Sequence, residues 1–370
     1  MNKLTTPLLS VLGLIVGFST HAQDSYLNFQ LRLEPVWSRV ADVMGERGSV
    51  ESVEFSPDGE YIVSGTKFDY SVVVWQTADG TKLWKQKAGA EIERVGWSYD
   101  SKYVAAASED YLATVYDAQT GEVVREYEHT SGIDGLIWAN RKSWLVTGEE
   151  QSADGKGMIR VFNAEEGKEI QAFNFGGTVN ELFFSGDDAW LVAVGHNKVA
   201  VYGTDDWQLE WEVKPEVPTI FTSGMFSPDA KQVIAVGTEA AGTEREIRGN
   251  VFIWDWKEGK LVKRFNHTGK KIESIAWHPN GKYIAHAGHD PYIYVYRVAE
   301  VLKHRNDNIP IAHKVWAGDN AEYIDFNADG SFLCSAHQNG LIKLWVWMGE
   351  ESDLNTRRHI EVIQEQKNKN

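Results

Sequence analysis

The ten residues SPDGEYIVSG at positions 56–65 combine a tight-turn sequence with an aromatic-led apolar run. Related stretches follow along the chain as SYDSKYVAAA, SGDDAWLVAV, SPDAKQVIAV, HPNGKYIAHA and NADGSFLCSA. Serine, proline, aspartate and glycine favour tight turns, so each stretch is typical of a β-hairpin. A single hairpin would be a local feature, whereas this many copies indicate a repeat architecture.

An aromatic residue ends the first strand of each copy and sets the period of the repeat. Successive aromatic residues lie 42, 41, 46, 42, 51 and 49 positions apart. They are Phe55, Trp97, Trp138, Phe184, Phe226, Trp277 and Phe326. A period of about 40–45 residues with four strands per repeat is typical of a propeller blade. We therefore expect an all-β, seven-bladed β-propeller of four-stranded antiparallel blades.

The third strands carry a family signature. VFIWD, which ends at Trp254 and Asp255, matches the signature of WD-repeat β-propellers in full, and VVVWQ, TVYDA and KLWVW match it more loosely. The resemblance covers about residues 36–347. It implies the propeller fold and leaves the function nearly open. The Gly-His pair of that family is approximated only at His129 and His267, so we expect an incomplete side-chain network inside the blades.

The resemblance also implies how the ring closes. The seventh copy has three strands and ends near Trp347, while residues 36–44, VWSRVADVM, precede the first copy. We expect this N-terminal segment to supply the missing strand, because closure removes exposed sheet edges. RRHIEVIQ at 357–364 is the alternative closing strand.

The first residues are typical of a secretory signal peptide. Lys3 precedes a short apolar core at 7–18, and small residues lead to a cleavage site after Ala22. An uncleaved membrane anchor is the alternative, but the apolar run is shorter than the ~20 residues that a span needs. We expect a signal peptide at 1–22, a propeller at 23–348 and a polar tail at 349–370. The mature protein would then be periplasmic or extracellular, without membrane insertion.

Composition narrows the class of partner. A net charge of −16 and an isoelectric point near 5.2 argue against nucleic acid or an anionic membrane as the main partner. Cys334 is the single cysteine, so the chain can form no internal disulfide, and we expect a buried, inert thiol. The sequence does not set the oligomeric state.

No catalytic constellation stands out, and we expect no catalytic residue, cofactor or metal. The densest group of ligand-type residues is HAGHD, with His286, His289 and Asp290. His286 falls within a predicted strand and Asp290 at a usual turn position, so a structural role is favoured. We expect a non-catalytic interaction scaffold.

Two other functional classes remain open. A propeller enzyme, similar to quinone-dependent dehydrogenases or lactonases, would use a Trp repeated after each outer turn, which Trp84 and Trp211 match. An adhesin or carbohydrate-binding module would bind through exposed aromatics, for which Trp84, Trp207 and Trp211 are the candidates.

A change of side-chain phase marks the first strand of each blade. Val50 is apolar, and Val53 and Phe55 then share the opposite parity, which predicts a β-bulge that re-aims one side chain. The resemblance implies that this side chain points to the mouth of the central channel. The seven candidates are Glu51, Glu93, Asp134, Asn180, Thr222, Glu273 and Glu322, of which five are acidic. A cationic partner would relieve their repulsion, and we expect another exported protein with a basic surface or loop.

Three loops exceed the repeat, at 148–157, 237–250 and 298–308, and the last of these is compatible with a short helix. Long insertions on a compact scaffold often carry binding sites, but surface loops also tolerate insertion, and the sequence does not decide between these readings.

Overall fold

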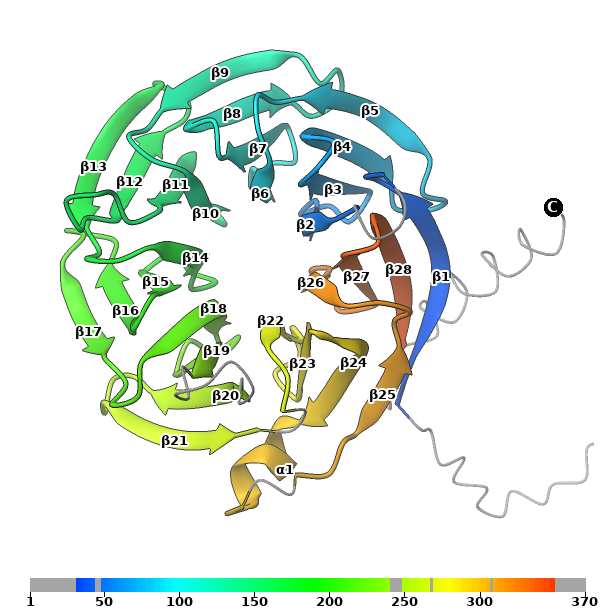
Figure 1. Ribbon diagram of the computed structural model, residues 1–370, viewed down its shortest axis with the longest axis vertical. Helices are drawn as coiled ribbons and strands as arrows, with labels where there is room; N and C mark the ends of the chain where they lie inside the picture. The colour runs from blue at the N-terminus through cyan, green and yellow to red at the C-terminus, as the bar shows by residue number, and fades with distance from the viewer. Residues whose placement is uncertain (1–30, 44–47, 240–247, 267–268, 307–308, 350–370) are drawn as a thin grey trace, which may run out of the picture. The chain divides into compact units, whose positions relative to one another are not determined.

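The computed structural model describes residues 31–43, 48–239, 248–266, 269–306 and 309–349. Seven four-stranded antiparallel sheets surround one axis (Figure 1), which confirms the expected all-β, seven-bladed propeller. No helix in the described residues is long and apolar enough to cross a membrane. The expected signal peptide at 1–22, the tail from residue 350 and the alternative closing strand at 357–364 lie outside the described residues.

Each of the first six blades is formed by four consecutive strands. Blade 1 contains β2 (Val50–Phe55), β3 (Tyr61–Thr66), β4 (Ser71–Gln76) and β5 (Lys82–Lys87). Blade 2 contains β6 (Ile92–Trp97), β7 (Tyr103–Ser108), β8 (Leu112–Asp117) and β9 (Val123–Glu128). Blade 3 contains β10 (Ile133–Trp138), β11 (Trp144–Glu149), β12 (Met158–Asn163) and β13 (Lys168–Asn174). Blade 4 contains β14 (Val179–Phe184), β15 (Trp190–Gly195), β16 (Lys198–Gly203) and β17 (Leu209–Val213).

The remaining blades carry the longer strands and the ring closure. Blade 5 contains β18 (Thr219–Phe226), β19 (Gln232–Glu239), β20 (Arg248–Asp255) and β21 (Lys260–Phe265). Blade 6 contains β22 (Ile272–Trp277), β23 (Tyr283–Gly288), β24 (Asp290–Arg297) and β25 (His313–Trp316), with the short helix α1 (Val298–Lys303) before β25. Blade 7 contains β26 (Ala321–Phe326), β27 (Phe332–His337), β28 (Leu341–Met348) and the N-terminal β1 (Arg32–Val40).

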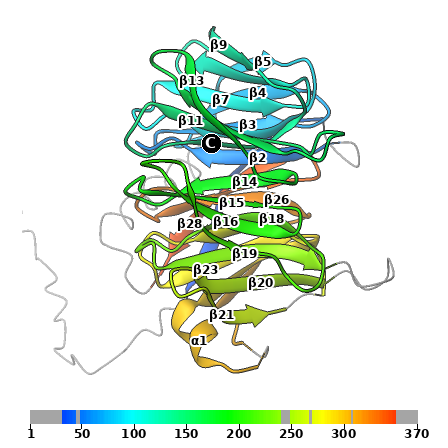
Figure 2. The same cartoon turned by 90° about the vertical axis from the view of Figure 1, so that its left-hand side faces the viewer.

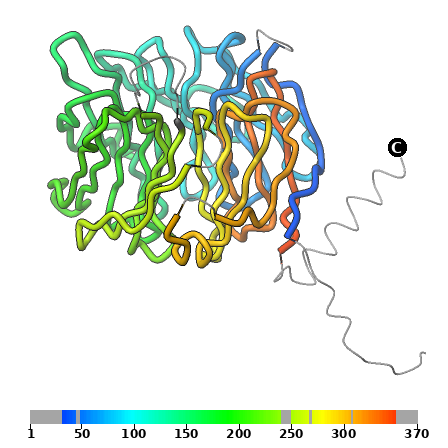
Figure 3. Tube along the Cα trace, turned by 60° about the horizontal axis from the view of Figure 1, so that its bottom comes forward, coloured from blue at the N-terminus to red at the C-terminus, as the bar shows by residue number. Residues whose placement is uncertain are grey.

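The N-terminal strand closes the ring, as expected (Figure 1, Figure 3). β1 pairs antiparallel with β28 from Arg32 opposite Met348 to Val40 opposite Leu341. The strand begins four residues earlier and ends four residues earlier than the predicted range 36–44. It ends at Val40 because the Asp42 carboxylate accepts hydrogen bonds from the backbone amides of Ser49 and Phe68, which turns the chain toward blade 1.

The inner strands lie between neighbouring blades, which stack face to face in the side view (Figure 2). Val72, Val73 and Val74 of β4 are fully buried, whereas the outer strand β13 has no fully buried residue. A strand covered on both faces is apolar without alternation, and this accounts for the apolar gradient across each blade.

A serine side chain stabilises the turn between the first and second strands of several blades. Ser56 Oγ donates to Asp58 Oδ1 at 2.6 Å and accepts from the Tyr61 amide at 3.0 Å. Ser98, Ser185 and Ser227 make the same two contacts in blades 2, 4 and 5. The turn therefore recurs in the sequence because its side chains satisfy its own backbone groups.

The network inside the blades is partial, as expected. The Trp75 indole donates to Ser64 Oγ at 3.0 Å in blade 1, and Trp345 donates to Ser335 Oγ at 2.8 Å in blade 7. His129 contacts Thr147 Oγ1 at 2.8 Å in blade 3. Cys334 is a buried free thiol, in agreement with its predicted burial.

Candidate functional site

All seven first strands carry a β-bulge at the same position. The register shifts between Val50 and Ser52 in blade 1, and the corresponding shift occurs in every other blade. The bulged residues are Glu51, Glu93, Asp134, Asn180, Thr222, Glu273 and Glu322, which we call the bulge ring. The predicted phase change is thus a real bulge in each blade.

The bulges bring the seven side chains to one place. All seven line a single cavity of about 460 Å³, which we call the axial cavity. Seven further residues line the cavity and were not predicted from the sequence. Glu91, Glu109, Glu150, His196 and Lys271 come from connections between strands, and Arg94 and Ile220 come from β6 and β18. Glu150 lies in the long loop at 148–157, so this loop contributes to the site. The repeat holds a signal for the five residues outside the strands, because the connections before the first strand and after the second strand meet at the same end of every blade.

The two uncharged members of the bulge ring link neighbouring blades. The Asn180 side chain donates to the Phe221 carbonyl at 2.6 Å, and Thr222 Oγ1 donates to the Ile272 carbonyl at 2.8 Å. Asn180 and Thr222 therefore connect neighbouring blades of the propeller. The negative charge of the cavity comes from its carboxyl groups.

Burial and mutual repulsion disfavour ionisation on one side of the axial cavity. Burial, the hydrogen bond with Glu91 and the charges of Glu51 and Asp134 together raise the pKa of Glu93 to about 9. Burial and the neighbouring Glu150 raise the pKa of Glu109 to about 7, and Asp134 behaves in the same way.

The other side of the axial cavity contains compensating cations. Glu273 lies 2.6 Å from Lys271 Nζ and 2.9 Å from His289 Nε2. Although burial opposes its ionisation, these two partners lower the pKa of Glu273, while the hydrogen bond to Glu273 raises the pKa of His289. Burial raises the pKa of Glu322 to about 7, with Glu273 and Glu51 as further causes.

The histidines of the HAGHD stretch separate in the structure. His286 stacks between the rings of Tyr294 and Tyr296 inside blade 6, in agreement with a structural role. His289 instead lies beside Glu273 and Glu322, which line the axial cavity, and one ligand atom from each of these three lies within 4.8 Å of the others. Glu109, Asp134 and Glu150 form a second such group. Among the residues that the structure describes, these two groups could hold a cation, and the expectation of no metal stays a prediction.

A layer of buried charge crosses the axis below the bulge ring. Arg94 of blade 2 donates to the Asn180 carbonyl of blade 4 at 3.0 Å, and its guanidinium carbon lies 4.6 Å from the ring centre of Tyr323 in blade 7. Tyr323 in turn donates to Glu181 Oε1 of blade 4 at 2.8 Å. Because these blades are not neighbours in the ring, the side chains meet across the axis and form a floor under the cavity.

Of the three tryptophans proposed for sugar binding, Trp84 is buried and Trp207 and Trp211 are half-buried, so the expected exposure is wrong for Trp84. Trp84 is 8% exposed, and its indole donates to the Ala118 carbonyl at 2.7 Å. Trp207 contacts Trp144, and Trp211 contacts Trp254, at ring-centre distances of 5.4 and 5.9 Å. These aromatic rings fill the space between blades and leave little surface for a ligand.

Comparison with known proteins identifies the repeat. The family model "WD domain, G-beta repeat" matches residues 37–76, 259–297 and 313–346. Each match begins in an outer strand and continues through the three inner strands of the following blade. The sequence repeat is thus offset by one strand from the blade, as closure by an N-terminal strand requires.

The chain is also similar to named proteins over about two thirds of its length. The chain is 20% identical over 253 residues to the serine-threonine kinase receptor-associated protein of Gallus gallus, covering 68% of this chain and 67% of that protein. It is 26% identical over 246 residues to eukaryotic translation initiation factor 3 subunit I of Vanderwaltozyma polyspora, covering 62% of this chain and 68% of that protein. Together with the seven blades and the closing strand, these matches make the chain similar to WD40-repeat β-propellers.

Proposed function

We propose that this protein is an exported, non-catalytic scaffold that docks a basic element of another exported protein on the acidic axial cavity. WD40 propellers are typically protein-interaction scaffolds, and WD40 proteins bind protein partners. The observation that carries the finer proposal is the convergence of five acidic bulge residues on one cavity. The export part rests on the signal-peptide pattern at 1–22.

Electrostatics favour a cationic partner at this site. The cavity lining contains eight carboxyl groups, from Glu51, Glu91, Glu93, Glu109, Asp134, Glu150, Glu273 and Glu322, against Arg94 and Lys271. Carboxylates held this close repel one another, and part of that repulsion shows in the raised pKa values. Lysine or arginine side chains entering the cavity would replace the repulsion by attraction and be steered toward it over about 8 Å at physiological salt.

Removing charge from the bulge ring tests the docking site. The triple variant Glu51→Gln, Asp134→Asn and Glu322→Gln should bind a lysine octapeptide at least about tenfold more weakly than the native protein, a difference readily measured by calorimetry. The melting temperature should not fall, since the variant removes repulsion.

A matched control separates the site from net charge. Glu60, Glu122 and Glu258 are exposed carboxylates in turns away from the bulges. The triple variant of these residues to Gln changes the net charge equally and should bind the peptide like the native protein. An equal loss of affinity in both variants, or no binding by the native protein, would overturn the proposed site.

The export part has its own test. The full chain, produced in a bacterial host, should appear outside the cytoplasm with Gln23 as its first residue, as read by N-terminal sequencing. Retention in the cytoplasm with residues 1–22 intact would overturn export without affecting the docking site.

A further inference from the structure

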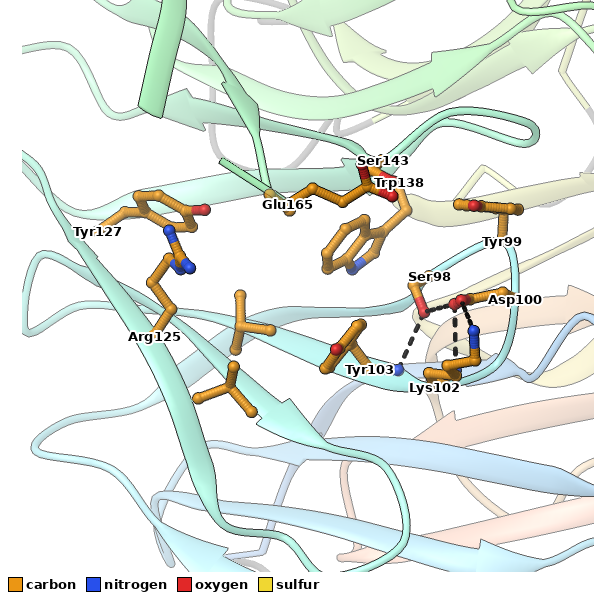
Figure 4. A pocket seen from close by; sticks show the side chains of 13 residues that line it. Ser98, Tyr99, Asp100, Lys102, Tyr103, Arg125, Tyr127, Trp138, Ser143 and Glu165 are labelled. Atoms are coloured by element: carbon orange, nitrogen blue, oxygen red, sulfur yellow. Dashed lines mark hydrogen bonds and ion pairs between the residues drawn. The ribbon is translucent and has the colours of Figure 1, made fainter. Parts of the chain in front are cut away.

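A second cavity lies between blades 2 and 3, away from the bulge ring (Figure 4). Its volume is about 290 Å³, and we call it the inter-blade pocket. Tyr103, Val115 and Tyr127 line it from blade 2, and Trp138 and Ala164 line it from blade 3. An apolar cavity of about 150 Å³ is enough to hold benzene, so the pocket has room for an indole.

Two other blades have a tryptophan at the equivalent position of the outer strand. In blade 1, Trp84 of the outer strand stands opposite Val74, and in blade 4 Trp211 stands opposite Val201. The same register position in blade 2 is Arg125, opposite Val115. One position of the repeat therefore decides whether the space between two blades receives an aromatic ring.

The contacts of Trp84 show which groups surround an indole at this position. Its indole donates to the Ala118 carbonyl and lies against Gly121, where an added Cβ would be 2.8 Å from the ring. In the next blade, Ala164 and Gly167 hold the same two positions of the corresponding turn. Arg125 lies against Gly167 as Trp84 lies against Gly121, but Arg125 brings no ring. The pocket thus has the walls of an indole site without an indole.

The entrance of the inter-blade pocket and its polar groups indicate which kind of ligand it would bind. Tyr99 and Val124 at the rim are 39% and 48% exposed, so apolar surface surrounds the opening. Arg125 forms no ion pair with any carboxylate of the described residues, whereas Lys102 at the same rim is paired with Asp100 at 2.8 Å. Trp138 is only 5% exposed, and within the described part of the chain its indole N–H, which faces Tyr103 in Figure 4, has no acceptor.

We propose that the inter-blade pocket binds an aromatic side chain of a partner protein, with a carboxylate beside that aromatic residue paired to Arg125. The ring enters the cavity lined by Tyr103, Val115 and Trp138, beside the Arg125 side chain that lies against Gly167. The Arg125 guanidinium, which interacts with Tyr127 but has no carboxylate partner in the described residues, supplies the charge preference, and the exposed rim residues supply the apolar contact. This site is independent of the acidic axial cavity and carries the opposite preference for charge.

Two small probes test the ring and the carboxylate separately. N-acetyl-L-tryptophan carries both groups, and N-acetyl-L-tryptophanamide carries the ring alone. By calorimetry on the full chain, the acid should bind at least about threefold more tightly than the amide, and the Arg125→Gln variant should bind both equally. Equal binding of the two probes by the native protein would overturn the role of Arg125.

Filling the pocket from within tests its identity. The Arg125→Trp variant should bind the acid at least about tenfold more weakly and melt at a higher temperature, because the new indole reproduces the contacts of Trp84 and can donate to the Ala164 carbonyl. Gln171→Trp places the same substitution opposite Val161 in blade 3 and should leave binding unchanged. Undiminished binding by Arg125→Trp would overturn the proposal, as would an equal loss in Gln171→Trp.

Discussion

Glu93 combines burial with like-charge neighbours more than any other member of the bulge ring. Its pKa of about 9 means that the folded protein holds this proton far more tightly than a solvated carboxyl with a pKa of 4.5 would. Asp134 and Glu322, with pKa values of about 7, follow the same direction. The acidic cavity therefore exchanges protons near neutral pH, and a bound cation would displace them.

The sign of the pKa shifts predicts how stability depends on pH. A raised carboxyl pKa stabilises the folded state fully below pH 4.5, and this contribution is lost as the pH rises through about 7 toward about 9. The free energy of unfolding, from urea titrations, should therefore fall across this range. Glu93→Gln should reduce the fall by at least about 1 kcal/mol, and the exposed control Glu122→Gln should not. A native stability that rises over this range would contradict the assignment.

The bulge ring could be predicted from the sequence because its residues occupy one position of each repeat. Each bulge residue follows an apolar residue and precedes a change of parity, so its direction could be inferred. Arg94 could not be found in this way, because its partners Asn180 and Tyr323 lie in distant repeats and meet it only across the closed ring. Trp84 was misplaced for a similar reason, since an outer strand is exposed only where the next blade leaves it uncovered.

The repeated turn is the element that the sequence specifies most locally. Ser56 bonds within the turn, and Gly59 adopts φ +75°, a left-handed conformation that glycine accepts readily. The bounds of the closing strand β1 could be predicted less well from the sequence. Its start at Arg32 depends on the length of β28, which is its partner strand and lies far away in the sequence. Local hydrogen bonds could thus be read from residues 56–65, whereas the bounds of β1 required the folded ring.

At Gly59 in this turn, the effect of backbone strain can be tested without a steric clash. A Cβ added at Gly59 would meet no atom within 4 Å, so Gly59→Ala introduces no clash. The left-handed conformation should nevertheless cost about 1 kcal/mol of unfolding free energy, measured by urea titration. Gly59→Asn should cost less, because asparagine tolerates this conformation. Equal stability of the native and alanine proteins would show that the turn relaxes without strain.

At the scale of the whole molecule, the Arg94 layer joins blades that the chain does not place side by side. Arg94 contacts blade 4 and blade 7 from blade 2, and Glu181 is held by Tyr323 and by the Gly224 amide of blade 5 at 2.7 Å. Such contacts form only when the ring has closed, so they connect the stability of distant blades.

Removing Arg94 should therefore destabilise the entire ring. Arg94→Ala leaves Glu181 buried without its cation, and we expect a loss of about 3–5 kcal/mol, seen as one shifted unfolding transition by calorimetry. The exposed Arg141→Ala variant serves as control and should melt like the native protein. A loss under about 1 kcal/mol would mean that the buried layer contributes little to holding the blades together.

The pairing of β1 with β28 has a mechanical consequence. Arg32 stands opposite Met348, so the beginning of β1 and the end of β28 lie side by side in blade 7. Tension applied between these ends would load the hydrogen bonds one after another, as in a zipper, rather than all together in shear. A pull on the outer ends of β1 and β28 would therefore open the ring at blade 7 one hydrogen bond at a time.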